Sequence, residues 1–190
     1  MDKSIIRNLL MPELDLVESE EEKDKILSIW QEAIAAGGWE DLDKLLISPI
    51  SIYVNMNCPE NCFTHTRNVT ALANAVYDTL TPLIELMGAK CSKQDLIEGA
   101  LLHDVGKLTE MDIVNGENVQ THFGDLFTHP VYGAYLAQKH GIRQNVVHMI
   151  LTHSNGLSPQ GAKAYNTPES LILKYLDDMT YRFVEMHYKK

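Results

Sequence analysis

The sequence predicts an all-α fold, and three observations support this prediction. Apolar side chains recur at intervals of three and four residues along most of the chain. Capping residues and prolines stand where these periodic stretches begin, and glycines stand where several of them end. No convincing series of short alternating strands interrupts them. With 190 residues, of which 45% are hydrophobic, the chain has enough apolar side chains for a single domain with its own core.

The first half of the chain is expected to hold two main helices. In order, we expect a helix at 20–36, a short helical turn at 41–46, an irregular segment at 49–59 and a helix from 61 to about 80. Gly37 follows the first of these stretches, as is common at helix ends. A break near Pro82 or Gly88 is expected to end the longer helix.

The second half is expected to hold four helices and two loops. In order, we expect a helix at 93–103, an unperiodic loop at 109–128, helices at 129–140 and 143–153, a second loop at 157–167 and a last helix at 168–187. Ser92 is suited to cap the first of these helices, and Gly106 suits its exit. Pro130 and Pro168 stand in first turns, where proline is tolerated. A loop as long as 109–128 is often a functional lid.

Composition excludes several classes of protein. The net charge of −10 argues against binding to a nucleic-acid polymer, which requires basic surface, but allows a small phosphorylated substrate beside a metal ion. The sequence has no apolar run long enough to cross a membrane and no signal-peptide pattern at its start, so a cytoplasmic location is expected. The three cysteines (Cys58, Cys62 and Cys91) are too few for a disulfide framework, and we expect them to be structural or incidental.

Histidines and aspartates recur at helix-length intervals from residue 65 onward. The set comprises His65, the doublet His103-Asp104, His129, His153 and Asp177. Imidazole nitrogen and carboxylate oxygen suit divalent ions such as Fe, Mn or Zn. One such histidine alone is usually a packing or surface residue, but the ordered set favours a metal site. Six donors exceed the needs of one tetrahedral ion, whereas two ions bridged by Asp104 would use them all.

Asp177 is expected in the middle of a helix whose neighbouring residues are apolar. Leu171, Ile172, Leu173 and Leu176 precede it. An unpaired carboxylate in such surroundings is costly to bury, and a metal ion or a histidine partner would remove that cost. This reasoning singles out Asp177 from the other acidic residues.

These segments resemble the HD superfamily of metal-dependent phosphohydrolases. The run Leu101-Leu102-His103-Asp104-Val105-Gly106-Lys107 resembles the family's most recognisable segment, and Thr64-His65-Thr66 and Leu176-Asp177-Asp178 resemble its flanking segments. The resemblance covers about residues 61 to 180 and does not explain the first sixty. It implies an HD-domain helical bundle at 61–188, with residues 1–60 as a helical extension packed on that core.

His129 and His153 resemble the subgroup that binds two metals, often iron or manganese. That subgroup includes dinucleoside polyphosphate hydrolases, cyclic-dinucleotide phosphodiesterases and a few mixed-valence diiron oxygenases. The Gly-Tyr-Pro segment of the cyclic-dinucleotide class is absent. The segment 152–156 and the helix at 130–137 look most similar to the dinucleoside polyphosphate type. Histidine and carboxylate also serve Zn, Ni, Co and Mg, so the metal stays open.

The resemblance implies a division of roles among these residues. One metal would be held by His65, His103, Asp104 and Asp177. The second would be held by Asp104, His129 and His153. A water activated by the metals would be the nucleophile. Lys107, one helical turn after the doublet, would bind phosphate as a point charge and act in catalysis with Asp104, and Arg143 and Arg182 are further candidates for phosphate contact. His122 in the long loop would be within reach of a substrate.

Three functions therefore stand side by side. The first is a phosphohydrolase that cleaves a phosphate ester or anhydride of a small nucleotide-like substrate. The second is a diiron oxygenase of the same fold, and the third is a non-catalytic signalling or binding module. A homodimer is also plausible, because Trp30, Trp39 and apolar helix surface in the first sixty residues have no partner that the sequence identifies.

Overall fold

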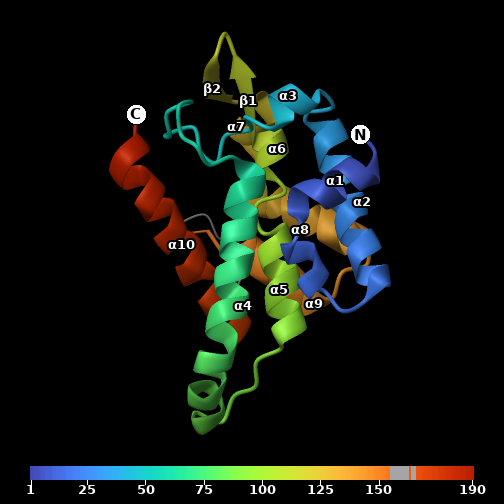
Figure 1. Ribbon diagram of the computed structural model, residues 1–190, viewed down its shortest axis with the longest axis vertical. Coiled ribbons are helices and arrows are strands. Elements are labelled where there is room, and N and C mark those ends of the chain that lie inside the picture. The colour runs from blue at the N-terminus through green and yellow to red at the C-terminus, as the bar shows by residue number, and fades with distance from the viewer. Residues whose placement is uncertain (155–162, 164–165) are drawn as a thin grey trace.

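The protein is helical, as Figure 1 shows for the computed structural model. The structure describes residues 1–154, 163 and 166–190. The expected all-α fold class is confirmed. Most of the loop expected at 157–167, and the residues Asn155 and Gly156 that follow the helix before it, lie outside the described residues. Within the described ranges, no helix combines the length and the apolar character needed to cross a membrane.

The N-terminal third folds as a run of short and medium helices. These are α1 (Lys3–Leu10), the 3-10 helix η1 (Glu13–Leu16), α2 (Glu20–Ala36) and α3 (Leu42–Leu45). The bounds of α2 agree with the prediction. The helix starts at Glu20 because Ser19 caps it by accepting a hydrogen bond from the backbone N–H of Glu22. The sequence reasoning did not find α1 or η1, which are too short to produce several periods of apolar spacing.

The long helix α4 (Cys62–Leu86) runs further than expected. Its start is confirmed by the side chain of Asn61, which accepts hydrogen bonds from the backbone N–H groups of Phe63 and Thr64. Of the two expected break points, Gly88 is confirmed and Pro82 is not, because the helix continues through this proline. Pro82 is exposed, so the carbonyl that loses its helical partner can be satisfied by water. Gly88, with φ of +75°, follows the true end.

The remaining helices match their predicted positions within one or two residues. They are α5 (Lys93–Leu102), α8 (His129–Lys139), α9 (Gln144–Thr152) and α10 (Pro168–Tyr188). Ser92 caps α5 by accepting from the N–H of Asp95, and Thr167 caps α10 by accepting from the N–H of Ser170. Pro130 and Pro168 both stand in first turns.

The stretch 109–128, expected to be an unstructured loop, contains regular elements. The short helix α6 (Lys107–Glu110) leads into an antiparallel hairpin of β1 (Met111–Val114) and β2 (Glu117–Gln120), which is followed by α7 (His122–Leu126). The Asn115-Gly116 pair makes the turn with φ of 53° and 80°, the positive values that a tight two-residue hairpin needs. The Asn-Gly pair was the available signal for this hairpin.

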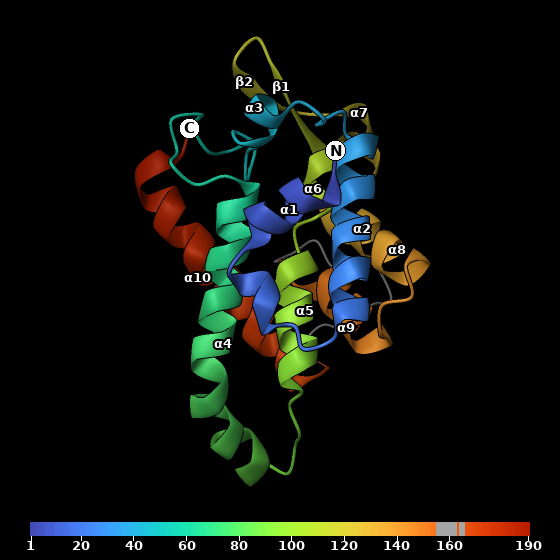
Figure 2. The ribbon, with the colours of Figure 1, turned by 45° about the vertical axis from the view of Figure 1, so that its right-hand side comes forward.

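One continuous core joins the first sixty residues to the rest of the chain. Figure 2 shows α2 running alongside α5. The ring of Trp30 packs on Phe63, with centroids 4.6 Å apart, and its Nε1 donates a hydrogen bond to the carbonyl of Leu101 at 3.0 Å. Trp39 donates to the carbonyl of Leu108 at 2.7 Å. Both tryptophans are buried inside the chain, so they give no support to the expected homodimer, which stays a prediction.

Candidate metal centre

Five separate elements bring the predicted residues to one place. His65 comes from the first turn of α4, His103 and Asp104 follow α5, and Asp177 lies in the middle of α10. His129 opens α8 and His153 follows α9. The four histidines and Asp104 are buried, and the Asp177 side chain is 15% exposed. The six side chains that the sequence singled out therefore lie together, although residues up to 112 positions apart contribute them.

Gly106 allows the start of α8 to approach the His103-Asp104 doublet. A Cβ atom on Gly106 would lie only 2.1 Å from the backbone oxygen of His129, so no larger residue fits without moving the helix. This close approach brings the Nε2 atom of His129 to 3.4 Å from Oδ1 of Asp104. The glycine that the sequence reasoning placed at a helix exit thus has a second use, which is to let His129 reach the centre.

The two oxygens of Asp104 face two different groups of donors. Oδ2 lies 3.4 Å from Nε2 of His65 and 3.3 Å from Nε2 of His103. Oδ1 of Asp177 lies 3.0 Å and 3.6 Å from the same two nitrogens. We call these four residues the first donor set.

On the other side of Asp104, Oδ1 lies 3.4 Å from Nε2 of His129 and 3.5 Å from Nε2 of His153. The two imidazole nitrogens are 3.3 Å apart. We call Asp104, His129 and His153 the second donor set. Asp104 therefore belongs to both sets and uses a different oxygen for each.

These separations fit the coordination shell of divalent ions. Two donors that each lie about 2.1 Å from one ion are about 3.0 to 3.4 Å apart when the angle between them is 90° to 109°. Within the described part of the chain, Nε2 of His103 and Oδ1 of Asp104 are buried and form no hydrogen bond. Burying polar atoms without partners is costly, and a bound cation would remove this cost. Both donor sets therefore fit a metal ion.

The opposite ring nitrogens hold the histidines in the orientation that a metal requires. Nδ1 of His103 donates to the carbonyl of Ala100, and Nδ1 of His153 donates to that of Ile150, each at 2.7 Å. Because a carbonyl oxygen can only accept, each Nδ1 carries a proton, and Nε2 is the nitrogen that faces the centre and binds a metal once it is unprotonated.

Carboxylates face the same nitrogen of the remaining two histidines. Nδ1 of His129 donates to Oε2 of Glu110 at 2.5 Å, whereas Oε2 of Glu60 lies 3.4 Å from Nδ1 of His65 and forms no hydrogen bond with it. Sequence reasoning missed both glutamates. Neither belongs to a motif that the sequence reasoning used, and Glu110 lies 19 residues before His129, so the two meet only because the chain turns back between them.

The charges of the centre favour cations. Burial lowers the pKa of His103, but the carboxylates of Asp104 and Asp177 outweigh this effect and raise the pKa to about 10. Burial raises the pKa of the Asp104 carboxyl, yet the charges of Lys107 and His103 hold it well below its ordinary value. Burial lowers the pKa of His153, which favours the neutral imidazole that metals bind.

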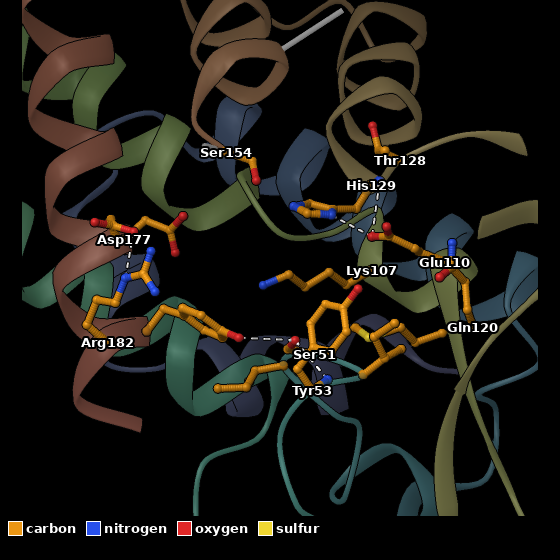
Figure 3. Close-up of a pocket in the computed structure, with 15 residues that line it drawn as sticks. Ser51, Tyr53, Lys107, Glu110, Gln120, Thr128, His129, Ser154, Asp177 and Arg182 are labelled. Carbon is orange, nitrogen blue, oxygen red and sulfur yellow. Dashed lines mark hydrogen bonds and ion pairs between the residues drawn. The ribbon is translucent and has the colours of Figure 1, made fainter. Parts of the chain in front are cut away.

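A cavity of about 390 Å³ opens onto the centre. In Figure 3, His129 and Ser154 lie on one side of it, Asp177 and Arg182 at one end, and Glu110 and Gln120 at the other. The remaining lining residues are Ile50, Ser51, Ile52, Tyr53, Lys107, Met111, Thr128, Asp178 and Tyr181.

Of the candidate substrate contacts Lys107, His122 and Arg143, only Lys107 lines this cavity. Lys107 reaches into this cavity, with its Nζ 2.5 Å from Oδ2 of Asp104. His122 is exposed at the start of α7 and does not line the cavity, so its expected role has no support in this arrangement. Arg143 pairs with the buried carboxylates of Asp95 and Glu98 and also lies outside the lining.

Comparison with known proteins places the chain in a family. The family model described as "HD domain" matches residues 62–182, a range that contains both donor sets and most of the chain. Comparisons with curated proteins and with solved structures gave no match. Divalent metal binding and phosphohydrolase activity are widespread in the matched family, in keeping with the clustered histidines and aspartates. The chain therefore belongs to the HD domain family.

Proposed function

We propose that this protein is a metal-dependent phosphohydrolase that cleaves a phosphate ester or anhydride of a small nucleotide-like substrate. The position of Asp104 carries this proposal, because its two oxygens face two separate groups of metal donors at the inner end of a cavity. Lys107 and Arg182 line the same cavity and would attract an anionic substrate.

We propose two divalent ions as cofactors, one in each donor set. When bound, they would activate a water molecule as the nucleophile and offset charge on the phosphoryl oxygens. Histidine and carboxylate donors suit iron or manganese, and they also accept zinc, nickel, cobalt or magnesium. The buried histidines keep these donors away from bulk solvent, which strengthens every charge interaction at the centre.

The chain's own groups would position the substrate. The ammonium of Lys107 is held near Asp104 at the inner end of the cavity, where a phosphate group would lie. A lysine there would bind the phosphate as a compact positive charge. Ser154 also lines this part of the cavity and could donate a hydrogen bond to a phosphate oxygen.

Variants of the doublet test this proposal. Full-length protein purified with manganese or iron is assayed for phosphate release from a panel of nucleotides and from bis-p-nitrophenyl phosphate. His103→Ala and Asp104→Ala should abolish turnover and reduce bound metal while leaving the helical circular dichroism signal largely unchanged. His187→Ala removes an exposed histidine far along α10 and should behave as wild type.

Two results would contradict the proposal. Full activity in both doublet variants would remove the assigned centre from the reaction. Oxygen uptake with a mixed-valence iron signal, in the absence of phosphate release, would instead identify a diiron oxygenase built on the same donors.

A further inference from the structure

One wall of the cavity is built by a segment outside the family match. Residues 50–53 line the cavity, whereas the HD domain match begins at residue 62. Figure 3 shows Ser51 and Tyr53 on the side opposite His129 and Ser154. The candidate metal donors all come from the matched range. Residues 50–53 therefore add a wall to the cavity that the matched range alone would not form.

The backbone of this segment is fixed by parts of the chain that are far away in sequence. The amide nitrogen Nδ2 of Asn118, a buried residue on β2, donates to the carbonyls of Ser51 at 2.6 Å and Val54 at 2.8 Å. The backbone N–H of Lys190 donates to the carbonyl of Tyr53 at 2.9 Å. A buried asparagine and Lys190, which follows α10, thus hold residues 51–54 in one conformation.

The Tyr53 side chain contrasts with this fixed backbone, because it is 63% exposed. Within the described ranges its ring packs on no other aromatic ring, and its hydroxyl forms no hydrogen bond. Tyrosine has few rotatable bonds, so a ring on a fixed backbone loses little conformational entropy when a flat ligand stacks on it. The buried side chains of Ile50 and Val54 anchor the two ends of the segment, so the backbone that carries Tyr53 is fixed while the Tyr53 ring itself stays exposed.

We infer that Tyr53 is the platform on which a planar aromatic group of the substrate, such as a nucleobase, stacks. The inference rests on the proposed function and extends it to the organic part of the substrate. Tyr53 and Lys107 line the same cavity, so one molecule can place its phosphate beside Lys107 and its ring against Tyr53. A stacking platform of this kind strengthens binding about 5- to 150-fold.

Two ligands that differ only in the aromatic group test this inference. The probes are the methylenephosphonate analogues of adenosine monophosphate and of ribose 5-phosphate, which share the anion and the sugar and resist hydrolysis. Their dissociation constants are measured by calorimetry on manganese-loaded full-length protein. Wild type should prefer the adenosine analogue, and the uridine analogue should show whether a pyrimidine is accepted as well.

Variants of Tyr53 separate stacking of the aromatic group from other effects of the tyrosine. Tyr53→Ala should weaken binding of the adenosine analogue about 5- to 150-fold and change binding of the ribose analogue less than about twofold. Tyr53→Phe, which keeps the ring, should bind the adenosine analogue nearly as wild type does. Tyr135→Ala removes a comparably exposed tyrosine (56%) on α8 outside the cavity and should leave both constants unchanged.

Several outcomes would overturn the inference. Equal losses for both analogues in Tyr53→Ala would mean that the tyrosine maintains the shape of the cavity. Equal affinity of wild type for both analogues, or binding of neither, would mean that the cavity has no aromatic subsite. Phosphate release is measured separately, so a retained preference for the adenosine analogue without hydrolysis would reject the phosphohydrolase and keep the subsite.

Discussion

Replacing Glu110 with alanine should weaken metal binding in the second donor set and leave the first set nearly unchanged. Oε2 of Glu110 accepts hydrogen bonds from both the Nδ1 and the backbone N–H of His129, at 2.5 Å and 3.2 Å. The glutamate side chain is only 15% exposed, so water cannot easily replace it. Without it, the imidazole of His129 is free to rotate and its buried N–H loses its partner.

The size of the effect follows from the role of such supporting carboxylates. Removing a group that orients a metal-binding histidine typically costs 10- to 100-fold in metal affinity, or about 1.4 to 2.7 kcal/mol. Glu110→Gln keeps one hydrogen-bond acceptor and should fall between wild type and Glu110→Ala. Glu60 faces Nδ1 of His65 at the longer distance of 3.4 Å, so Glu60→Ala should have a smaller effect, confined to the first set.

The assay is a stepwise titration of chelator-stripped protein with Mn²⁺ against a competing indicator dye. Wild type should give two dissociation constants, and Glu110→Ala should shift one of them. The reasoning would be refuted if both constants shifted together, because Glu110 would then support the whole centre rather than His129. It would also be refuted if neither constant moved.

Three further predictions concern the substrate, the core and pH. Lys107→Ala should raise KM for a phosphorylated substrate roughly tenfold or more, since it removes a charged contact to phosphate. The metal content should stay unchanged, and loss of metal would instead assign Lys107 a structural role. Trp39→Phe should lower the free energy of unfolding by about 1 to 3 kcal/mol, because the carbonyl of Leu108 loses its buried donor, and an unchanged urea midpoint would contradict this. Burial raises the pKa of Glu98 despite the Arg143 guanidinium 2.9 Å away, so its contribution to stability is fully present below pH 4.5 and is lost as pH rises through the raised pKa. Glu98→Gln should therefore gain stability relative to wild type as pH rises above 4.5, and urea unfolding that showed the opposite trend would be inconsistent with this pKa.

Local signals in the sequence predicted the helices well where the caps are strong. Ser92 and Pro168 mark helix starts that agree with the structure within one residue, because each satisfies or tolerates the free N–H groups of a first turn. Of the two expected stops for α4, Gly88 agrees with the structure and Pro82 does not, because an exposed proline late in a helix costs less than a buried one. The hairpin at 111–120 was missed because its strands of four residues are too short for an alternating pattern to stand out.

The candidate metal donors could be picked out from the sequence because their chemistry leaves few alternatives. A buried carboxylate such as Asp177 needs a partner, and ordered histidines supply one. The residues that support or surround these donors were not predictable in the same way. Glu60, Glu110 and Tyr53 are common residue types at positions without a motif, and only the folded chain brings them beside His65, His129 and the cavity.

The domain boundary is a further point on which the structure adds to the sequence. The division into an extension at 1–60 and an HD domain at 61–188 stays a prediction. Residues from both parts share one core, as Trp30 and Phe63 illustrate. Residues 50–53 of the extension also form part of the cavity wall, so the extension contributes to the site and not only to packing.

The most direct test of the two-ion centre bridged by Asp104 is the number of metal ions bound per chain. The metal content of protein purified without oxygen is measured by inductively coupled plasma mass spectrometry, alongside that of Asp104→Ala and Glu110→Ala. Wild type should hold two ions of iron or manganese per chain, Asp104→Ala should lose both, and Glu110→Ala should retain close to one at limiting metal. A single ion in wild type, with no second ion after reconstitution, would contradict the bridging role of Asp104 and reduce His129 and His153 to contacts of the cavity.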